Sequence, residues 1–163
     1  KIGQTTSAHP QLTVLLPATT AQAVEISLFD AQMRGIYQTT VAIPEQTGLV
    51  SFHLPKDAPA LEVGKTYRWT IALICNRADR TEDWVVGGWI QRSQLTPALS
   101  AQLVGKSALE QVTLYAQAGF WYDALGTLTQ TQSVDTSALA IARTWNQLLR
   151  TAELETIVTI NTL

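Results

Sequence analysis

The sequence predicts a mainly β protein of the α+β class. We expect an immunoglobulin-like antiparallel β-sandwich in residues 1–93, followed by a small helical bundle in residues 94–163. Two observations lead to this prediction. Between residues 11 and 92, β-prone segments are separated by turn signals at roughly the eight-to-twelve-residue spacing of small sandwiches. After Ser93, apolar residues recur at helical spacing and helix-capping residues appear. We expect the two parts to pack as one unit.

Six strands are predicted, and the polar segment that precedes them, residues 1–10, is expected to be frayed. In the second strand Val24, Ile26 and Leu28 fall on one face, as a half-buried strand requires. Proline and glycine residues mark several of the turns between the strands. The predicted strands are residues 11–16, 23–29, 36–43, 49–54, 66–75 and 84–92.

The last two strands form a long hairpin that carries three of the five tryptophans. The charged segment 76–83 is the predicted turn. The adjacent Gly87 and Gly88 indicate a bulge or a close backbone approach in the second strand. Cys75 is the only cysteine, so it cannot form an intramolecular disulfide and is expected to be a small core residue. The predicted buried face of the first strand consists of Tyr67, Trp69, Ile71, Leu73 and Cys75.

The spacing Leu61-x-x-Gly64-x-x-Tyr67 just before this hairpin predicts a tyrosine corner. In such a corner the leucine packs inward, the glycine turns the chain, and the tyrosine hydroxyl reaches a backbone group upstream. This feature is typical of immunoglobulin-like and fibronectin-type sandwiches, so it supports the predicted fold.

Four helices are predicted after the hairpin. Thr96 and Pro97 are a good N-cap and first helical residue, and Ser107 with Glu110 forms a capping box. The middle two helices are expected to form a helical hairpin. The predicted helices are residues 97–104, 108–118, 120–131 and 137–152.

Composition excludes several classes of protein. Charged residues make up 15% of the chain and the net charge is −2, with the basic residues scattered, so neither nucleic acid nor an anionic membrane surface is an expected partner. The chain lacks an apolar run of about 18 residues, so we expect no membrane insertion of this segment. It begins at Lys1 rather than Met, and its low charge is common in extracytoplasmic proteins. We therefore expect a periplasmic or secreted protein whose leader, or a longer N-terminal region, has been removed.

Motifs along the chain resemble the cyanobacterial family of the domain of unknown function 928. They are Leu61-Glu-Val-Gly-x-x-Tyr67-x-Trp69, Gly88-Trp-Ile-Gln-Arg92, Trp121-Tyr-Asp-Ala-Leu125 and Trp145-x-x-Leu-Leu149, together with Pro17, Gly48, Leu54-Pro55 and Cys75. The resemblance covers nearly the whole chain, roughly residues 12–158. It implies an exported protein with a leader peptide. It implies no activity, cofactor or catalytic residue.

The residues needed for common chemistries are scarce. His9 and His53 are the only histidines, and one cysteine cannot complete a zinc site. Neither histidine accompanies a recognisable nucleophile elbow, and no glycine-rich phosphate loop is present. The acidic residues of the turn 76–83 lie among arginines and are expected to be solvated. We therefore expect no catalytic, metal or cofactor site, and no enzyme activity.

Aromatic residues are the remaining candidates for a site. Trp84, Trp89, Phe120, Trp121 and Tyr122 could line a face that binds a glycan or a peptide, but packing at the junction of sandwich and helices is the preferred interpretation. At this junction Arg92 leaves the last strand and Asp123 follows the aromatic residues. We predict a buried or half-buried salt bridge between them. The candidate interaction or coupling residues are Trp89, Arg92, Trp121, Tyr122 and Asp123.

Two hypotheses for the function follow. The first is a non-catalytic module of the bacterial cell envelope that binds an unknown protein partner through sheet edges or a helical groove. The second is carbohydrate or small-ligand binding, or weak hydrolysis, on the aromatic face. The exposure of Trp84, Trp121 and Tyr122 distinguishes the two hypotheses. The second requires that two or more of these side chains line one concave pocket together with carboxylates.

Overall fold

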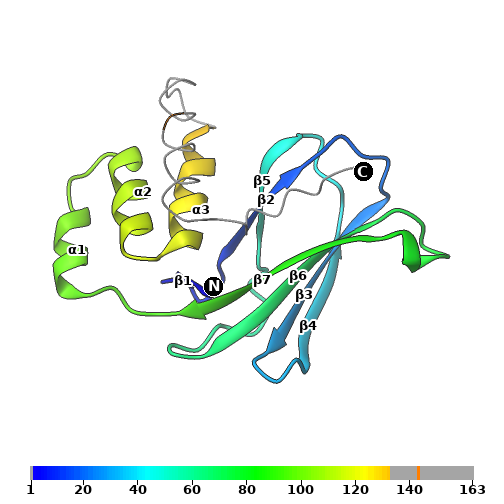
Figure 1. Ribbon diagram of the computed structural model, residues 1–163, viewed down its shortest axis with the longest axis horizontal. Helices are drawn as coiled ribbons and strands as arrows, with labels where there is room; N and C mark the ends of the chain where they lie inside the picture. Colours follow the sequence, from blue (N-terminus) through cyan, green and yellow to red (C-terminus); the bar gives the residue numbers. More distant parts are fainter. Residues whose placement is uncertain (1, 133–142, 144–163) are drawn as a thin grey trace.

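The computed structural model describes residues 2–132 and 143, and it is built mostly of strands. The strands are β1 (Ile2–Thr5), β2 (Gln11–Leu16), β3 (Ala23–Asp30), β4 (Gly35–Val41), β5 (Gly48–His53), β6 (Thr66–Ile74) and β7 (Trp84–Arg92). The helices are α1 (Pro97–Leu103), α2 (Ala108–Gln117) and α3 (Trp121–Gln132), and a 3-10 turn covers Arg80–Glu82. The helices gather beside the sheets at the end where β1 begins (Figure 1).

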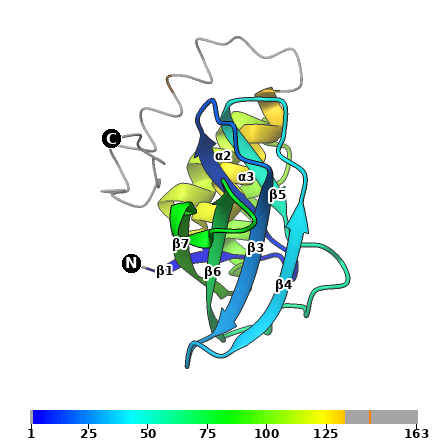
Figure 2. The same ribbon diagram turned by 90° about the vertical axis from the view of Figure 1, so that its right-hand side faces the viewer.

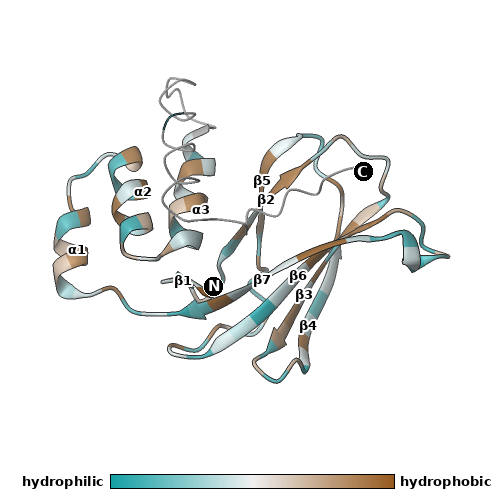
Figure 3. Ribbon diagram, in the orientation of Figure 1, coloured by the Kyte–Doolittle hydropathy of each residue, from teal (hydrophilic) through white to brown (hydrophobic). Residues whose placement is uncertain are grey.

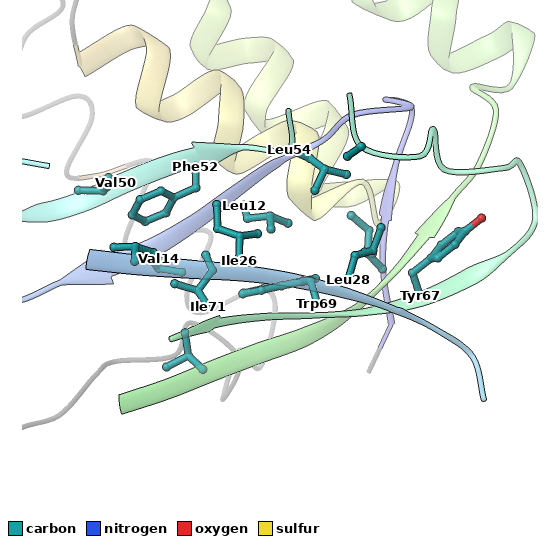
Figure 4. Close-up of a cluster of buried hydrophobic side chains, with 14 of the residues drawn as sticks. Leu12, Val14, Ile26, Leu28, Val50, Phe52, Leu54, Tyr67, Trp69 and Ile71 are labelled. Atoms are coloured by element: carbon teal, nitrogen blue, oxygen red, sulfur yellow. The ribbon is translucent and has the colours of Figure 1, made fainter. Parts of the chain in front are cut away.

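Two sheets enclose one apolar core. The larger sheet has the order β1-β7-β6-β3-β4, and the smaller sheet pairs β2 with β5. Leu12 and Val14 from β2 and Phe52 from β5 point toward Ile26 of β3 and Ile71 of β6 (Figure 4). Leu12 and Val14 are two residues apart, and Phe52, Ile26 and Ile71 each have a buried residue two positions away in the same strand (Val50, Leu28 and Trp69). The period-2 pattern of the sequence therefore directs these side chains inward.

The hairpin of β6 and β7 lies at the centre of the larger sheet (Figure 2). The predicted buried face is confirmed for Tyr67, Trp69, Ile71 and Leu73, which are all buried. Cys75 lies just beyond β6 and is only half-buried, so the expectation of a core cysteine is wrong. Strand β6 ends at Ile74. A largely hydrophilic turn joins β6 to β7 (Figure 3).

The tyrosine corner is confirmed. The Tyr67 hydroxyl accepts a hydrogen bond of 3.1 Å from the backbone N–H of Glu62, five residues upstream. Gly64 has a φ of +83°, which only glycine adopts without strain, and Leu61 is 1% exposed. The corner therefore fixes the path of the chain into β6.

Of the two alternatives predicted for Gly87 and Gly88, the structure shows a close approach of other groups and not a bulge. The register between β6 and β7 is regular through Gly87 and Gly88. A Cβ on Gly88 would lie 3.0 Å from the indole nitrogen of Trp69 and 3.0 Å from the hydroxyl of Tyr122. The missing side chain of Gly88 thus makes room for a residue from α3.

The expectation that residues 1–10 are frayed is wrong. Residues 2–5 form β1, which pairs in parallel with β7, so the larger sheet is not purely antiparallel as predicted. On its other side, Gln4 donates a 3.1 Å hydrogen bond to the carbonyl of Gly119 between α2 and α3. The short polar strand therefore lies between the sheet and the helices.

The helix caps predicted from the sequence are confirmed. The Thr96 hydroxyl accepts from the N–H of Leu99, and Ser107 and Glu110 form both hydrogen bonds of the capping box. Helix α3 contacts α2 as well as β1, β2 and β5, so it connects the helical part to both sheets. Apart from residue 143, which is helical, the predicted helix over residues 137–152 lies outside the described residues. Among the described residues, the helices are too short or too polar to cross a membrane.

Candidate functional site

The first turn of α3 carries three of the five candidate residues, Trp121, Tyr122 and Asp123. Their side chains contact three different parts of the protein. Trp121 is 8% exposed and belongs to the apolar cluster between α2 and α3. Tyr122 packs against the core between the sheets. Asp123 faces the N-terminal segment, where it accepts hydrogen bonds from Thr6. Successive residues of a helix point about 100° apart, so three consecutive positions can contact three separate parts of the protein.

Tyr122 packs over the paired strands β1 and β7. Its ring lies over Gly3, where a Cβ would come within 2.6 Å of the ring. The indole N–H of Trp69 donates to the Tyr122 hydroxyl at 2.7 Å, and this hydroxyl donates to the backbone carbonyl of Trp89 at 3.0 Å. Burial of the phenol raises its pKa to about 12. Tyr122 is therefore a fixed contact between helix and sheet.

The predicted salt bridge between Arg92 and Asp123 does not form. Thr6 lies between the two side chains and binds both of them. Its N–H and hydroxyl donate to the Asp123 carboxylate at 3.0 and 2.7 Å, while its carbonyl accepts from Nε of Arg92 at 3.2 Å. Nη1 of Arg92 also donates to the carbonyl of Leu61 at 2.8 Å. Arg92 and Asp123 thus connect the larger sheet and α3 to the N-terminal segment, because both bind Thr6.

The remaining aromatic candidates do not assemble into one face. Phe120 is 5% exposed in a cluster with α1 residues, and Trp84 is half-buried against the core between the sheets. Trp89 lies on the opposite face of the larger sheet from Trp69, with the guanidinium of Arg68 5.6 Å from its ring centroid. Tyr122 lines a pocket together with the carboxylate of Asp123.

That pocket is polar and contains both histidines of the chain. It has a volume of about 190 Å³, lies between the N-terminal segment and α3, and adjoins a second hollow of about 450 Å³ beside β2 and β5. The two hollows share Gln11, His53 and Gln130, and we call them together the polar groove. Apart from the shared residues, the first hollow is lined by Thr5, Ser7, His9, Tyr115, Tyr122, Asp123, Gly126 and Thr127.

Several groups in the polar groove have unused hydrogen-bonding capacity. The side-chain oxygen of Gln11 is fully buried and has no hydrogen-bond partner among the described residues. The Nε2–H of His9 is held by the carbonyl of Ala58 at 3.0 Å, which leaves Nδ1 of the neutral ring as an acceptor. His53 is exposed, and its ring makes no hydrogen bond within the described part of the chain. These groups can bind a polar molecule, but among the described residues no set of metal-ligating side chains comes together.

Asp123 is the charged group of the polar groove. Burial raises the pKa of this carboxyl above its usual value, although hydrogen bonds from Thr6 and Thr5 act in the opposite direction. The part of the chain described here places no lysine or arginine along the first hollow. Burial also raises the pKa of the Tyr115 hydroxyl, and the nearby Asp123 charge adds to this shift.

We expect the carboxyl group of Asp123 to titrate above 3.8 and that of Asp30 below it. Asp30 is half-buried and accepts a backbone hydrogen bond from Arg34, which lowers its pKa. A raised folded-state pKa stabilises the fold below the unfolded-state value of about 3.9, and this contribution is lost as pH rises through the folded-state value. Asp30, whose pKa is lowered, has the opposite effect: its contribution to stability is present above the unfolded-state value and is lost as pH falls through the folded-state value. Carboxyl carbon shifts measured by NMR between acidic and neutral pH test both residues in one sample, and Asp123 titrating at or below Asp30 would contradict the prediction.

Sequence reasoning missed the groove residues of the N-terminal segment. Thr5, Ser7, His9 and Gln11 all line the first hollow. They occupy alternate positions, as expected of an extended chain that presents one polar face. This period-2 polar pattern is a usable signal of an extended segment, and it argues against the frayed end expected for residues 1–10.

Comparison with known proteins gives a family but no activity. No curated protein matches the chain. One family model matches residues 1–162 and is described as a domain of unknown function, DUF928. The motifs of the β6–β7 hairpin and of the first turn of α3, which carry the structural contacts above, all lie within the match. The chain therefore belongs to the DUF928 family.

Proposed function

We propose that this protein is a non-catalytic interaction module of the bacterial cell envelope, periplasmic or secreted, that binds a protein partner by strand addition to β4. In this proposal the two sheets act as an immunoglobulin-like sandwich, and residues 1–93 and 94–163 work as one unit. The observation that carries the proposal is the outer edge of β4, which no other described strand covers and which carries neither a charge nor a proline.

Strand β4 is the outermost strand of the larger sheet and pairs only with β3 among the described strands. Its sequence, GIYQTTV, contains no charged residue and no proline. Natural proteins protect exposed edges with charges, proline, bulges or covering segments, because an unpaired strand edge can pair with another chain. The only register shift lies at Leu28/Phe29, near the turn into β4, and leaves residues 37–41 regular.

Exposed apolar side chains accompany this edge. Ile36 is 36% exposed, and Met33, in the turn before β4, is 53% exposed. Strand addition uses backbone hydrogen bonds for affinity and alternate side chains for specificity. Ile36, Gln38 and Thr40 would supply the side chains that contact the added strand on the outer face. An uncharged extended segment of the partner is the occupant that fits this edge.

The opposite edge of the sheet is not available in the same way. Strand β1 has four residues, and the Gln4 N–H on its outer side is bound by the carbonyl of Gly119. The burial of Trp121 and Phe120 in helical clusters also favours a protein-binding module over a ligand-binding aromatic face. The poor inventory of catalytic residues supports the same choice.

Two neighbouring proline substitutions test the proposal. Successive N–H groups of a strand point to opposite sides, so one of Gln38→Pro and Thr39→Pro removes a hydrogen bond to β3, while the other removes only an outward N–H. We expect one variant to have a clearly lower melting temperature, and the other to fold normally.

The normally folded proline variant should lose its partner. The measurement is affinity capture from periplasmic and secreted fractions with the whole chain as bait, comparing this variant with the unmodified protein. Proteins captured by the unmodified chain should be missing with the folded variant. Equal capture by both would show that the β4 edge is not the binding surface.

A further inference from the structure

We propose that the polar groove binds a neutral oligosaccharide, independently of the partner bound at β4. The inference rests on three features of the groove: polar groups without partners, a mixture of donors and acceptors, and two adjoining hollows of suitable size.

Gln11 provides the most specific observation. Its buried side-chain oxygen has no hydrogen-bond partner and lies at the position where the two hollows meet. A buried amide atom without a partner is unfavourable, whichever of the two polar atoms of the amide occupies this position. Gly126 on α3 leaves the room for it, because a Cβ there would lie 2.8 Å from this oxygen. The folded protein thus keeps an unfavourable group at the groove, and a bound polar molecule would satisfy it once the amide turns toward the hollow.

The other polar groups of the first hollow require a ligand that both donates and accepts. Asp123, Gln11 and Nδ1 of neutral His9 are acceptors. The hydroxyls of Tyr115 and Thr127 make no hydrogen bond within the described residues, and each can donate. A ligand hydroxyl serves both kinds of group, whereas an ammonium group only donates. A ligand carboxylate or phosphate would meet the negative charge of Asp123.

The size and lining of the two hollows favour a chain of sugar units over a single small ligand. The first hollow, at about 190 Å³, has room for about six water molecules, which suits one sugar ring better than a drug-sized molecule. The second hollow is lined partly by Pro44, Leu49 and Val50, which offer apolar contacts to the C–H faces of a second ring. Gln11 and His53 border both hollows, so a linear saccharide can contact them at the link between two units.

The test is an NMR titration of the whole isotope-labelled chain with three classes of compound. Neutral oligosaccharides are represented by cellobiose, chitobiose and maltotriose, a diamine by putrescine, and an acidic sugar by digalacturonate. We expect at least one neutral oligosaccharide to shift the signals of Gln11, His53 and Thr127. Binding of putrescine or digalacturonate without any neutral sugar would overturn the proposal, and so would shifts confined to residues outside the groove.

Two variants separate a role in binding from a role in folding. Gln11→Leu removes the buried unpaired amide, so it should keep or raise the melting temperature and still weaken sugar binding at least tenfold. His53→Ala changes an exposed ring and should weaken binding without affecting the fold. Gln22→Leu, at an exposed position outside the groove, is the matched control. Unchanged affinity of Gln11→Leu and His53→Ala would overturn the proposal.

Discussion

Replacing Tyr122 by alanine is expected to lower the free energy of unfolding by about 3–5 kcal/mol, the usual cost of removing a large buried aromatic side chain. The ring fills the space over Gly3 and Gly88 and packs edge-to-face against Trp69 at 6.4 Å between ring centroids. Its removal leaves a cavity between helix and sheet, and it leaves the indole N–H of Trp69 without its acceptor. Urea unfolding of both proteins measures the difference.

The hydroxyl of Tyr122 can be tested separately. Tyr122→Phe keeps the ring but removes the acceptor of Trp69 and the donor to the Trp89 carbonyl, so we expect a loss of about 1–3 kcal/mol. Tyr37→Phe is the matched control, because the Tyr37 hydroxyl bonds Asp57 at an exposed position. It should change stability by less than about 0.5 kcal/mol. Equal effects of the two phenylalanine variants would contradict the role assigned to Tyr122.

Replacing Arg92 by methionine is expected to cost about 2–3 kcal/mol. Arg92 donates to two half-buried carbonyls from distant segments, Thr6 and Leu61, and hydrogen bonds to charged groups contribute about 1.5–3 kcal/mol each. The sum is discounted because the side chain is only half-buried. Lysine lacks the forked set of donors, so the lysine of Arg92→Lys should reach only one of the two carbonyls. Its free energy of unfolding should therefore lie between those of the unmodified protein and Arg92→Met. Urea unfolding gives the free energies.

A surface arginine provides the control for Arg92. The Arg34 side chain is 76% exposed and pairs with Asp30, and such exposed pairs contribute about 0–1 kcal/mol. Arg34→Met should therefore be nearly neutral. Arg92→Met should also speed hydrogen exchange at the Gln4 amide, because β1 loses part of its attachment to the sheet. An Arg92→Met variant as stable as Arg34→Met would show that these two hydrogen bonds do not hold the N-terminal segment.

Local sequence signals predicted the elements well because the forces that form them act within a few residues. Alternation defined β2 and β7 to the residue, and the capping box at Ser107 placed the start of α2. The tyrosine corner was also predictable, since Leu61, Gly64 and Tyr67 lie within seven residues of one another. In each case the chemistry of neighbouring side chains and backbone groups is sufficient.

Contacts between distant segments were not predictable in the same way. Strand β1 is short and polar, and it forms because β7 offers an open parallel edge about 87 residues further along the chain, where Ile2 pairs with Trp89. The same register pairs Thr5 with Arg92 and places Thr6 just beyond this pair. The Thr6 carbonyl therefore accepts the Arg92 hydrogen bond that was predicted to go to Asp123. The sequence brought the two charged residues to one junction, but it could not show which residue would lie between them.

By itself the sequence determined a mainly β chain with three described helices, a tyrosine corner and a shortage of catalytic groups. Only the tertiary structure decided that Thr5, Ser7, His9 and Gln11 face α3, that Tyr122 is a structural contact, and that β4 is the outermost of the described strands in its sheet. The physical reason is that burial and hydrogen-bond satisfaction depend on which segments meet. Those meetings are set by sheet order and helix packing, which span the whole chain.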